Sequence, residues 1–521
     1  MAQYSWGRAH TKAARTALAS AAVVSGGGGY LVWWQSEKEE NSCNQSSSRL
    51  PAAIHLNYAQ SDDTANNTNS NIYPGGGAFP TTAQALWWIS HGTTTSSATT
   101  TTQCQSKPDP GYPDLSRFGK HSYLKKCLTP EIYSALKKKK TSKGVTLEDL
   151  IQSGVTLPWG ARPVRGCGVY AGDAESYQVF AKLLDPIVED WHHWRSDSLR
   201  HRSKAGPPEP PPPPTTGKNT KGVRISRQAT NLNPGYVLRQ NLDPDGEYIL
   251  QTRMRVARSV RGFPFSPKIS REQRRELETL IQTCTQDFQT TKDEDLKGSY
   301  TGVMEMTNEQ HADWIHRHIL FHDPDALSLS AGLGRDWPDA RGIYMNHSAP
   351  ETQNAPSYHV SPELMIWVNA EDHLRIISMS KGGDLLGVFT RLSKAIRALD
   401  ASLQKRGYGY ESDPRLGFLN PSPENLGTAL RASVFVKLPR LGQEPGFDEL
   451  LARLRLESST RFRGEFNNNA KYTGIFDIAN SERLGQSEVQ LINTMINGVG
   501  RLIALEKRLE KGEKVDLENI H

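Results

Sequence analysis

The sequence predicts an α+β protein in which a small all-α domain precedes a larger domain of mixed strands and helices. In the first part of the ordered chain, apolar residues recur at helical spacing, whereas from Tyr248 onward strand and helix patterns alternate irregularly. The larger domain also contains a hairpin pattern at residues 364–383, where two apolar runs flank a four-residue polar tip, Asn369 to Asp372. The alternative for that tip is a solvated acidic turn on the surface, without a functional role.

The composition indicates a folded protein diluted by irregular segments. The 521 residues suffice for two or three domains, but only 36% are hydrophobic, while glycine (43) and proline (31) are plentiful. The net charge of +6 is too small and diffuse for nucleic-acid binding, which needs a clustered basic stripe. The five cysteines include no CxxC pair, which argues against a disulfide framework or a zinc site and favours a reducing or mixed compartment.

The N-terminal segments are not expected to join the fold. Residues 1–36 lack Asp and Glu and carry basic residues among Ala, Ser and Thr, as in a mitochondrial presequence. A secretory signal or a single membrane anchor is the alternative, although the glycines at 26–29 each cost about 1 kcal/mol in a spanning helix. Residues 37–108 are rich in Ser, Thr, Asn and Gly. They are predicted to be disordered, because they bury too little apolar surface to offset the entropy of ordering.

Residues 109–202 are predicted to form the small all-α domain. Thr146 is a suitable N-cap for its second helix. A long loop from Gly154 to Gly172 carries Val164 and Tyr170. The helical patterns cover residues 130–138, 146–152 and 176–190.

Residues 203–233 are predicted to be an extended, proline-rich insert or linker, because residues 207–214 are almost all proline. A ligand for proline-binding domains is the alternative. Residues 234–521 are predicted to form the larger domain, with core helices at 269–288, 385–405 and 487–511. Ser487 and Gln490 form a capping box for the last of these.

Arginines recur near the predicted strand ends. Arg253 and Arg255 lie two apart in a predicted strand, so their guanidinium groups leave the same face roughly 6–7 Å apart. Arg375 follows the hairpin tip, and Arg431 follows a glycine-containing loop. Each planar guanidinium can pair with two phosphate oxygens, which predicts a nucleotide-phosphate site. The sequence contains no GxxxxGK[ST] or GxGxxG motif that could bind phosphate instead, and scattered surface arginines are the alternative.

Several long stretches carry a resemblance to a known family. They are RDWPDARGI at 335–343, WVNAEDHLRIISM at 367–379, NLGTALR at 425–431, RLG at 483–485, IQSGV at 151–155 and GDAESY at 172–177. On these stretches, the chain from about Tyr112 to His521 resembles the phosphagen (guanidino) kinases, of which creatine kinase and arginine kinase are members. The N-terminus is also similar to that of mitochondrial members, which lie in the intermembrane space.

The resemblance implies reversible transfer of the γ-phosphoryl group of Mg-ATP to a guanidino nitrogen. It also implies that the larger domain is an antiparallel sheet flanked by helices. Glu371 matches the carboxylate that orients the guanidinium and takes its proton as the N–P bond forms. The positions that match the ATP/ADP site are Gln251, Thr252, Arg253, Met254, Arg255, His318, Arg375, Arg431, Arg463 and Asp477. Arg461 is the alternative to Arg463 as the arginine of the mobile loop, and Asp372 is assigned a structural role.

The chain departs from the family pattern mainly around the guanidino substrate. Ala370 replaces a glutamate of the acidic tip, Ser422 replaces the reactive cysteine, and Glu424 stands where the family has a hydroxyl. Phe435 replaces a histidine four residues after Arg431, and about a dozen residues are inserted between positions 342 and 367. These changes motivate a second hypothesis, a nucleotide-binding relative with weak or lost transfer activity.

Creatine is the favoured acceptor, with arginine or another guanidino compound as the alternative. The length of the 154–172 loop is typical of creatine kinases, and Val164 falls about where an aliphatic residue packs on the creatine methyl group. Tyr170 instead resembles arginine kinase, where a tyrosine contacts the amino acid. Ser422 completes the expected substrate-binding residues.

The remaining expectations concern assembly and processing. The resemblance allows a monomer, a dimer or an octamer, and the mixed charges at 507–514 do not indicate a membrane-binding tail. A further hypothesis is that the segments 41–108 and 203–233 are unspliced or mis-predicted sequence.

Overall fold

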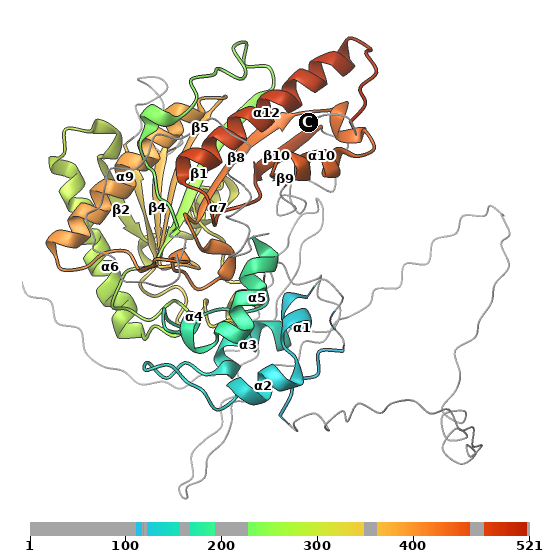
Figure 1. The fold of residues 1–521 in the computed structure, drawn as a ribbon. Coiled ribbons are helices and arrows are strands. Elements are labelled where there is room, and N and C mark those ends of the chain that lie inside the picture. The colour runs from blue at the N-terminus through green and yellow to red at the C-terminus, as the bar shows by residue number, and fades with distance from the viewer. Residues whose placement is uncertain are drawn as a thin grey trace, which may run out of the picture. The chain divides into compact units, whose positions relative to one another are not determined.

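The computed structural model describes residues 111–116, 118, 122–156, 167–192, 228–347, 362–458 and 474–517. These residues belong to one compact unit, and they form a small helical part and a larger part built on a sheet (Figure 1). The predictions for residues 1–108 and for the proline-rich run lie outside the described residues, as do Val164, Arg461 and Arg463.

The small part confirms the predicted all-α domain. Thr146 caps α3 as predicted, since its side chain accepts a bond from the Asp149 N–H and the Asp149 carboxylate accepts one from the Thr146 N–H. The single helix predicted at 176–190 is two helices, because the fully buried Phe180 adopts non-helical backbone angles between them. The helices are α1 (Tyr123–Cys127), α2 (Pro130–Leu136), α3 (Leu147–Val155), α4 (Ser176–Val179) and α5 (Ala181–Trp191).

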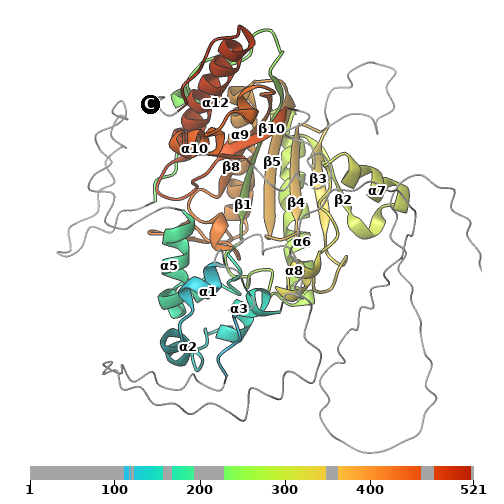
Figure 2. The ribbon, with the colours of Figure 1, turned by 90° about the vertical axis from the view of Figure 1, so that its right-hand side faces the viewer.

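The larger part contains an antiparallel sheet of eight strands, ordered β2-β3-β4-β5-β1-β8-β10-β9 (Figure 2). The strands β5, β1 and β8 lie at its centre. The bounds are β1 (Ile249–Arg258), β2 (Gly298–Gly302), β3 (Gly342–Asn346), β4 (Leu364–Val368), β5 (Leu374–Lys381), β8 (Leu430–Lys437), β9 (Leu456–Ser458) and β10 (Ile475–Asn480), with a separate pair, β6 (Ser412–Asp413) and β7 (Gly417–Phe418).

Three long helices pack on one face of this sheet and confirm the predicted core helices. They are α6 (Arg271–Gln286), α9 (Leu385–Lys405) and α12 (Glu488–Glu510). The Ser487–Gln490 capping box of α12 is present. The shorter helices are α7 (Asn308–His316), α8 (Ala326–Ser330) and α10 (Phe447–Arg453).

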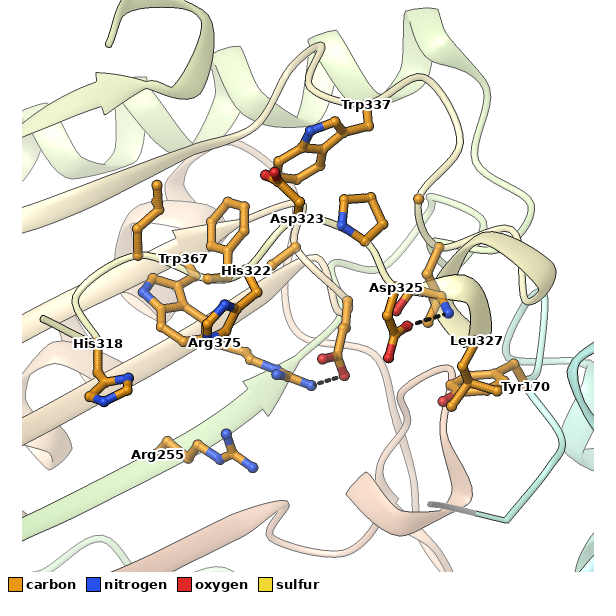
Figure 3. A pocket seen from close by; sticks show the side chains of 18 of the residues that line it. Tyr170, Arg255, His318, His322, Asp323, Asp325, Leu327, Trp337, Trp367 and Arg375 are labelled. Atoms are coloured by element: carbon orange, nitrogen blue, oxygen red, sulfur yellow. Dashed lines mark hydrogen bonds and ion pairs between the residues drawn. The ribbon is translucent and has the colours of Figure 1, made fainter. Parts of the chain in front are cut away.

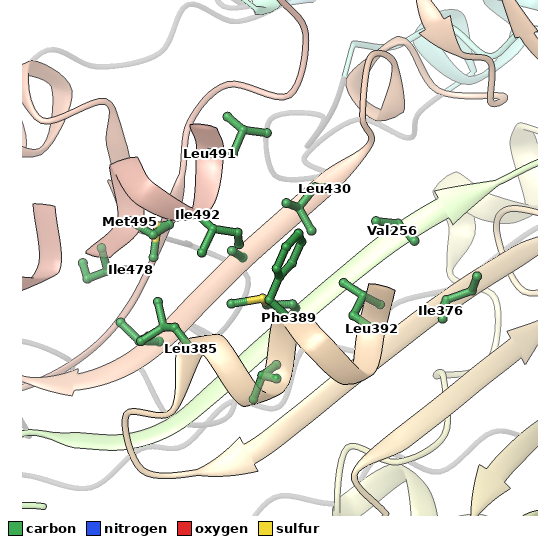
Figure 4. Packing of buried hydrophobic residues seen from close by; sticks show 14 of the residues in the cluster. Val256, Ile376, Leu385, Phe389, Leu392, Leu430, Ile478, Leu491, Ile492 and Met495 are labelled. Atoms are coloured by element: carbon green, nitrogen blue, oxygen red, sulfur yellow. The ribbon is translucent and has the colours of Figure 1, made fainter. Parts of the chain in front are cut away.

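The side chains of β1 alternate between the hydrophobic core and the opposite face of the sheet. Met254 and Val256 are fully buried in the core shared with α9 and α12, where Phe389 and Leu392 pack (Figure 4). Each such side chain contributes about 1.5–3 kcal/mol by leaving water. Because successive side chains alternate, Arg253 and Arg255 emerge on the face that these helices do not cover.

The hairpin prediction is confirmed, but its acidic tip is not a solvated turn. β4 and β5 pair from Val368 opposite Leu374, and the Asn369 N–H donates to the His373 carbonyl to close the turn. Asn369 has a left-handed φ of 56°, and its amide donates to the carbonyls of Arg274 and Ala340. Asp372 is buried, whereas the Glu371 side chain remains 40% exposed. The tip is therefore held in place by the surrounding chain.

Two further observations concern the whole described chain. Cys127, Cys167 and Cys284 carry free thiols, and no disulfide joins them. Within the described segments, none of the helices has the length and apolar character needed to cross a bilayer.

The loop before β8 is tightly packed around Gly427. The φ of Gly427 is +70°, and an added Cβ would lie 2.6 Å from Leu484 Cα. Gly407 has a φ of +82° but open space around it. We expect Gly407→Ala to lower the free energy of unfolding by about 1–2 kcal/mol, the cost of a left-handed residue. We expect Gly427→Ala to lower it by roughly 2–5 kcal/mol, because crowding adds to that cost.

Urea denaturation of both variants measures the difference. Equal losses of stability would show that the Gly427 loop adapts to a side chain.

Candidate active site

Arginines from three neighbouring strands gather on the face of the sheet that α6, α9 and α12 leave open. Arg255 of β1 lies directly opposite Arg431 of β8, and Arg375 of β5 lies opposite Ala257. Cross-strand partners share a face, so Arg253, Arg255, Arg375 and Arg431 all project from one side. Arg255, Arg375 and Arg431 also line a small void together with Arg483, which enters from the segment before α12.

Arg253 has buried polar atoms without a partner among the described residues. Its Nε and Nη2 atoms are buried and make no hydrogen bond there, while its Cζ lies 5.6 Å from the ring centroid of Trp367. Burial and the nearby Arg431 lower the pKa of Arg253 to about 10, so the group stays charged near neutral pH. A buried guanidinium with unused N–H groups is suited to bind an anion.

Arg375 is held by both carboxylates of the hairpin tip. Its Nη2 donates to Glu371 Oε2 at 2.6 Å, and its Nε donates to Asp372 Oδ2 at 2.9 Å. Burial opposes the charge on Arg375, but the two carboxylates outweigh burial and raise its pKa. This pairing fixes the guanidinium orientation and leaves Glu371 as the more exposed carboxylate.

Arg431 is oriented in the same way by Asp477 of β10. Its Nη2 donates to Asp477 Oδ2 at 2.9 Å, and the Asp477 side chain is almost fully buried. The other oxygen, Oδ1, is buried and has no hydrogen-bond partner within the described part of the chain. Asp477 therefore holds Arg431 at the open face of the sheet.

A pocket of about 520 Å³ lies against these groups (Figure 3). Figure 3 shows Tyr170 and Leu327 at one end, His318 at the other, and Arg375 between them. Trp337 and Trp367 form an aromatic wall. The lining also includes Arg253, Arg255, Ala370 and Glu371, together with two acidic side chains, Asp323 and Asp325. The pocket thus joins the cationic strand face to a carboxylate and to the small helical part.

Comparison with known proteins identifies the family. Residues 119–189 match the N-terminal domain of the ATP:guanido phosphotransferases, and residues 279–509 match their C-terminal catalytic domain. The chain is 39% identical over 409 residues to creatine kinase B-type of Gallus gallus, covering 78% of this chain and 94% of that protein. It is 36% identical over 416 residues to creatine kinase M-type of Canis lupus familiaris, covering 79% and 94%.

This chain belongs to the ATP:guanido phosphotransferase family.

Solved structures of relatives agree with this assignment. The crystal structure of lombricine kinase matches with a TM-score of 0.63 and 32% identity, covering 78% of this chain and 96% of that one. The duplicated taurocyamine kinase from Schistosoma mansoni, with bound transition-state-analogue components, matches with a TM-score of 0.61 and 28% identity. That match covers 76% of this chain and 48% of the duplicated one. The protein is therefore a kinase that transfers phosphoryl groups to a guanidino nitrogen.

The structure brings most residues expected at the phosphotransferase site to the open face. The pocket is lined by Arg253, Arg255, His318, Glu371 and Arg375. Arg431 adjoins Arg255 and is held by Asp477. Tyr170 reaches the pocket from the small domain, as a substrate contact requires.

Four other expected residues do not line this pocket. Met254 is fully buried in the core, and Thr252 Oγ1 donates to the Gly382 carbonyl at 2.8 Å, because both alternate to the opposite face of β1. Gln251 lies further along β1, opposite Phe435. Ser422 is buried outside the pocket lining, and its Oγ accepts the Glu424 N–H.

The candidate site also contains residues that sequence reasoning missed. Arg483 lay in a matched stretch, but nothing in its spacing showed that it would join Arg255 and Arg431. Asp323 and Asp325 follow His318 closely in the chain, and this proximity could have predicted that they line the same pocket. Trp337 and Trp367 were parts of matched stretches without an assigned role.

His373 ties the tip of the hairpin to the chain after β1. Its Nδ1 accepts the Val260 N–H at 3.0 Å, so the ring proton is on Nε2, which donates to the Pro264 carbonyl at 2.9 Å. Burial lowers the pKa of His373 from 6.5 to about 4. The folded protein therefore holds a neutral imidazole here at neutral pH.

This predicts acid sensitivity of the fold. Below pH 6.5 the unfolded chain protonates His373 while the folded protein does not, so the free energy of unfolding falls as pH drops from 6.5 toward 4. The contribution approaches about 1.4 kcal/mol per pH unit. Urea denaturation at pH 7.0, 6.0 and 5.0 should show a shallower pH dependence for His373→Gln, whose amide does not titrate. Parallel slopes for the variant and the native protein would contradict the assignment.

Proposed function

We propose that this phosphagen kinase reversibly transfers the γ-phosphoryl group of ATP to the guanidino nitrogen of creatine. The observation that carries the proposal is one pocket that contains three clamp arginines, Arg253, Arg255 and Arg375, together with Glu371. Tyr170 lies at one end of this pocket and His318 at the other, which leaves room for two substrates in line (Figure 3).

The arginines supply the electrostatic part of the reaction. Phosphoryl transfer requires alignment and charge stabilisation rather than covalent help from the protein. The unpartnered N–H groups of Arg253 suit phosphate oxygens, and the carboxylates that orient Arg375 and Arg431 reduce the reorganisation needed during reaction. The nucleotide phosphates are therefore assigned to this row of guanidinium groups.

Glu371 supplies the proton chemistry. It accepts a proton from the attacking guanidino nitrogen as the N–P bond forms and the bond from the γ-phosphorus to the bridging oxygen breaks, so that ADP leaves with the electron pair. In the reverse direction Glu371 returns the proton. Its partial exposure in the pocket wall allows contact with an acceptor that enters beside Tyr170.

Magnesium is assigned to the nucleotide substrate. Mg²⁺ usually keeps several waters and binds through substrate phosphates in kinase sites. We therefore propose that it enters as Mg-ATP and that the arginines neutralise the phosphate charge that remains.

Creatine is proposed on the similarity to creatine kinases of B-type and M-type and on the creatine-kinase-like length of the 154–172 loop. Similarity to lombricine kinase and taurocyamine kinase makes other guanidino acceptors, including arginine, the alternative. A nucleotide-binding protein without transfer is the second candidate, because Ala370 lines the pocket where the family pattern has a carboxylate.

A coupled assay of ADP formation with creatine, arginine, glycocyamine, taurocyamine and lombricine tests the proposal. We expect the highest kcat/KM with creatine. A higher value with another acceptor would refute creatine but keep the transfer. Nucleotide binding without turnover on any of the five would support the binding protein instead.

The Glu371→Gln variant tests the assigned base. We expect kcat to fall by about 10²–10⁴-fold, because the amide cannot take the proton. The nucleotide Kd should change less than about threefold, because the amide oxygen can still accept from Arg375.

Glu363→Gln is the matched control. Glu363 begins the same hairpin, pairs with Arg391 at 2.7 Å and is 43% exposed, close to the 40% of Glu371. It should keep native kinetics. Unchanged kcat in Glu371→Gln would remove Glu371 from the mechanism.

We further propose a mitochondrial location, in the intermembrane space, from the presequence-like composition of residues 1–36, and a homodimer or octamer from the family resemblance. Mass spectrometry of the native protein identifies its mature N-terminus and any peptides from segments 41–108 and 203–233. Light scattering gives its oligomeric state. A secreted chain or a monomer would contradict these two proposals.

A further inference from the structure

The segment Asn420–Glu424 of the larger domain forms a seam with the small domain. Three of its backbone carbonyls accept hydrogen bonds from small-domain groups. Tyr177 donates its hydroxyl to Asn420 at 2.7 Å, Ala171 donates its N–H to Pro421 at 2.7 Å, and His192 donates Nε2–H to Pro423 at 2.9 Å. We call residues 420–424 the seam segment.

Glu424 adds a side-chain contact to this seam. Its Oε1 accepts the N–H of Cys167 at 3.1 Å, across 257 positions of sequence. The Cys167 side chain is almost fully buried, and Tyr170, three residues later, lines the pocket. The Tyr170 N–H itself donates to the Leu150 carbonyl of α3. The short stretch from Cys167 to Tyr170 is thus held at both ends.

Glu424 also connects to the reacting end of the pocket. Its backbone carbonyl accepts from Arg483 Nη1 at 3.0 Å, and Arg483 donates to the Asn425 side chain as well. The Asn425 amide reaches Asp372 Oδ2 at 3.4 Å, and Asp372 orients Arg375. A continuous set of polar contacts therefore runs from Cys167 to the arginine paired with Glu371.

We propose that Glu424 is a positioning residue for the guanidino acceptor: its carboxylate fixes residues 167–170 so that Tyr170 closes the acceptor end of the pocket. The inference rests on the proposed function, because it assigns the Tyr170 end of that same pocket to the acceptor. The family pattern has an uncharged hydroxyl at this position. The carboxylate is a stronger acceptor than a hydroxyl for this half-buried N–H.

Glu424→Ala and Glu424→Gln test the proposal together. Glu424→Ala should raise the KM for the acceptor by about tenfold, the lower range for losing a charge-assisted hydrogen bond, and change the KM for ATP less than about twofold. Glu424→Gln keeps an acceptor oxygen and should restore the acceptor KM to within about threefold of native.

Glu175→Ala is the control variant. Glu175 is a small-domain carboxylate that accepts the N–H and hydroxyl of Ser142, away from the seam segment. It should leave both KM values unchanged. Equal increases in the two KM values of Glu424→Ala, or a lowered Tm with unchanged kinetics, would show a merely structural role and overturn the proposal.

Hydrogen exchange of the free protein separates this inference from the proposed function. Amides of residues 167–170 should exchange faster in Glu424→Ala than in native protein or Glu175→Ala, whatever the acceptor. Unchanged exchange at Cys167 would overturn the anchoring role. Absence of turnover in native protein on every acceptor would overturn the proposed function and the acceptor role of Glu424 while leaving the exchange result interpretable.

Discussion

The close packing of like charges on one face of the sheet is the constraint on which the site depends. Arg255 and Arg431 are direct cross-strand partners, an arrangement that is unfavourable unless other groups compensate. Asp477 compensates Arg431, and Glu371 with Asp372 compensates Arg375. Arg253 keeps buried N–H groups that no described residue satisfies. An anionic ligand would therefore offset the positive charge that remains on this face of the sheet. The phosphates transferred by this family of enzymes are such ligands.

Local patterns in the sequence were sufficient to predict most of the framework. The N-cap at Thr146, the capping box at Ser487 and the span of α9 follow from hydrogen-bonding and periodicity rules that act within a few residues. The shared face of Arg253 and Arg255 follows from strand alternation alone. The same rule could have placed Thr252 and Met254 on the opposite face, whereas their assignment came from the family resemblance.

Long-range contacts explain what the sequence could not predict. The hairpin tip looks like a solvated turn because its residues are polar. It is held in place, with Asn369 and Asp372 buried, because Asn369 bonds to two distant carbonyls and His373 to two more groups after β1. Arg483 joins the arginine row only through the packing of the segment before α12. The segment Asn420–Glu424 contacts small-domain residues that lie more than two hundred positions earlier in the sequence. No periodic pattern in either segment predicts that contact.

The departures from the family pattern have unequal physical consequences. Ser422 lies outside the pocket lining and acts as a cap, so loss of the thiol there removes no contact to the clamp arginines. Ala370 does line the pocket, so its missing carboxylate leaves Glu371 as the acidic group nearest to Arg375 on the exposed side of the tip. Glu424 adds a carboxylate at the domain seam instead. The chain therefore lacks one carboxylate in the pocket, at Ala370, and has an additional one at the contact with the small domain, at Glu424. The first change affects the groups that face the substrates, whereas the second affects how the pocket wall at residues 167–170 is held.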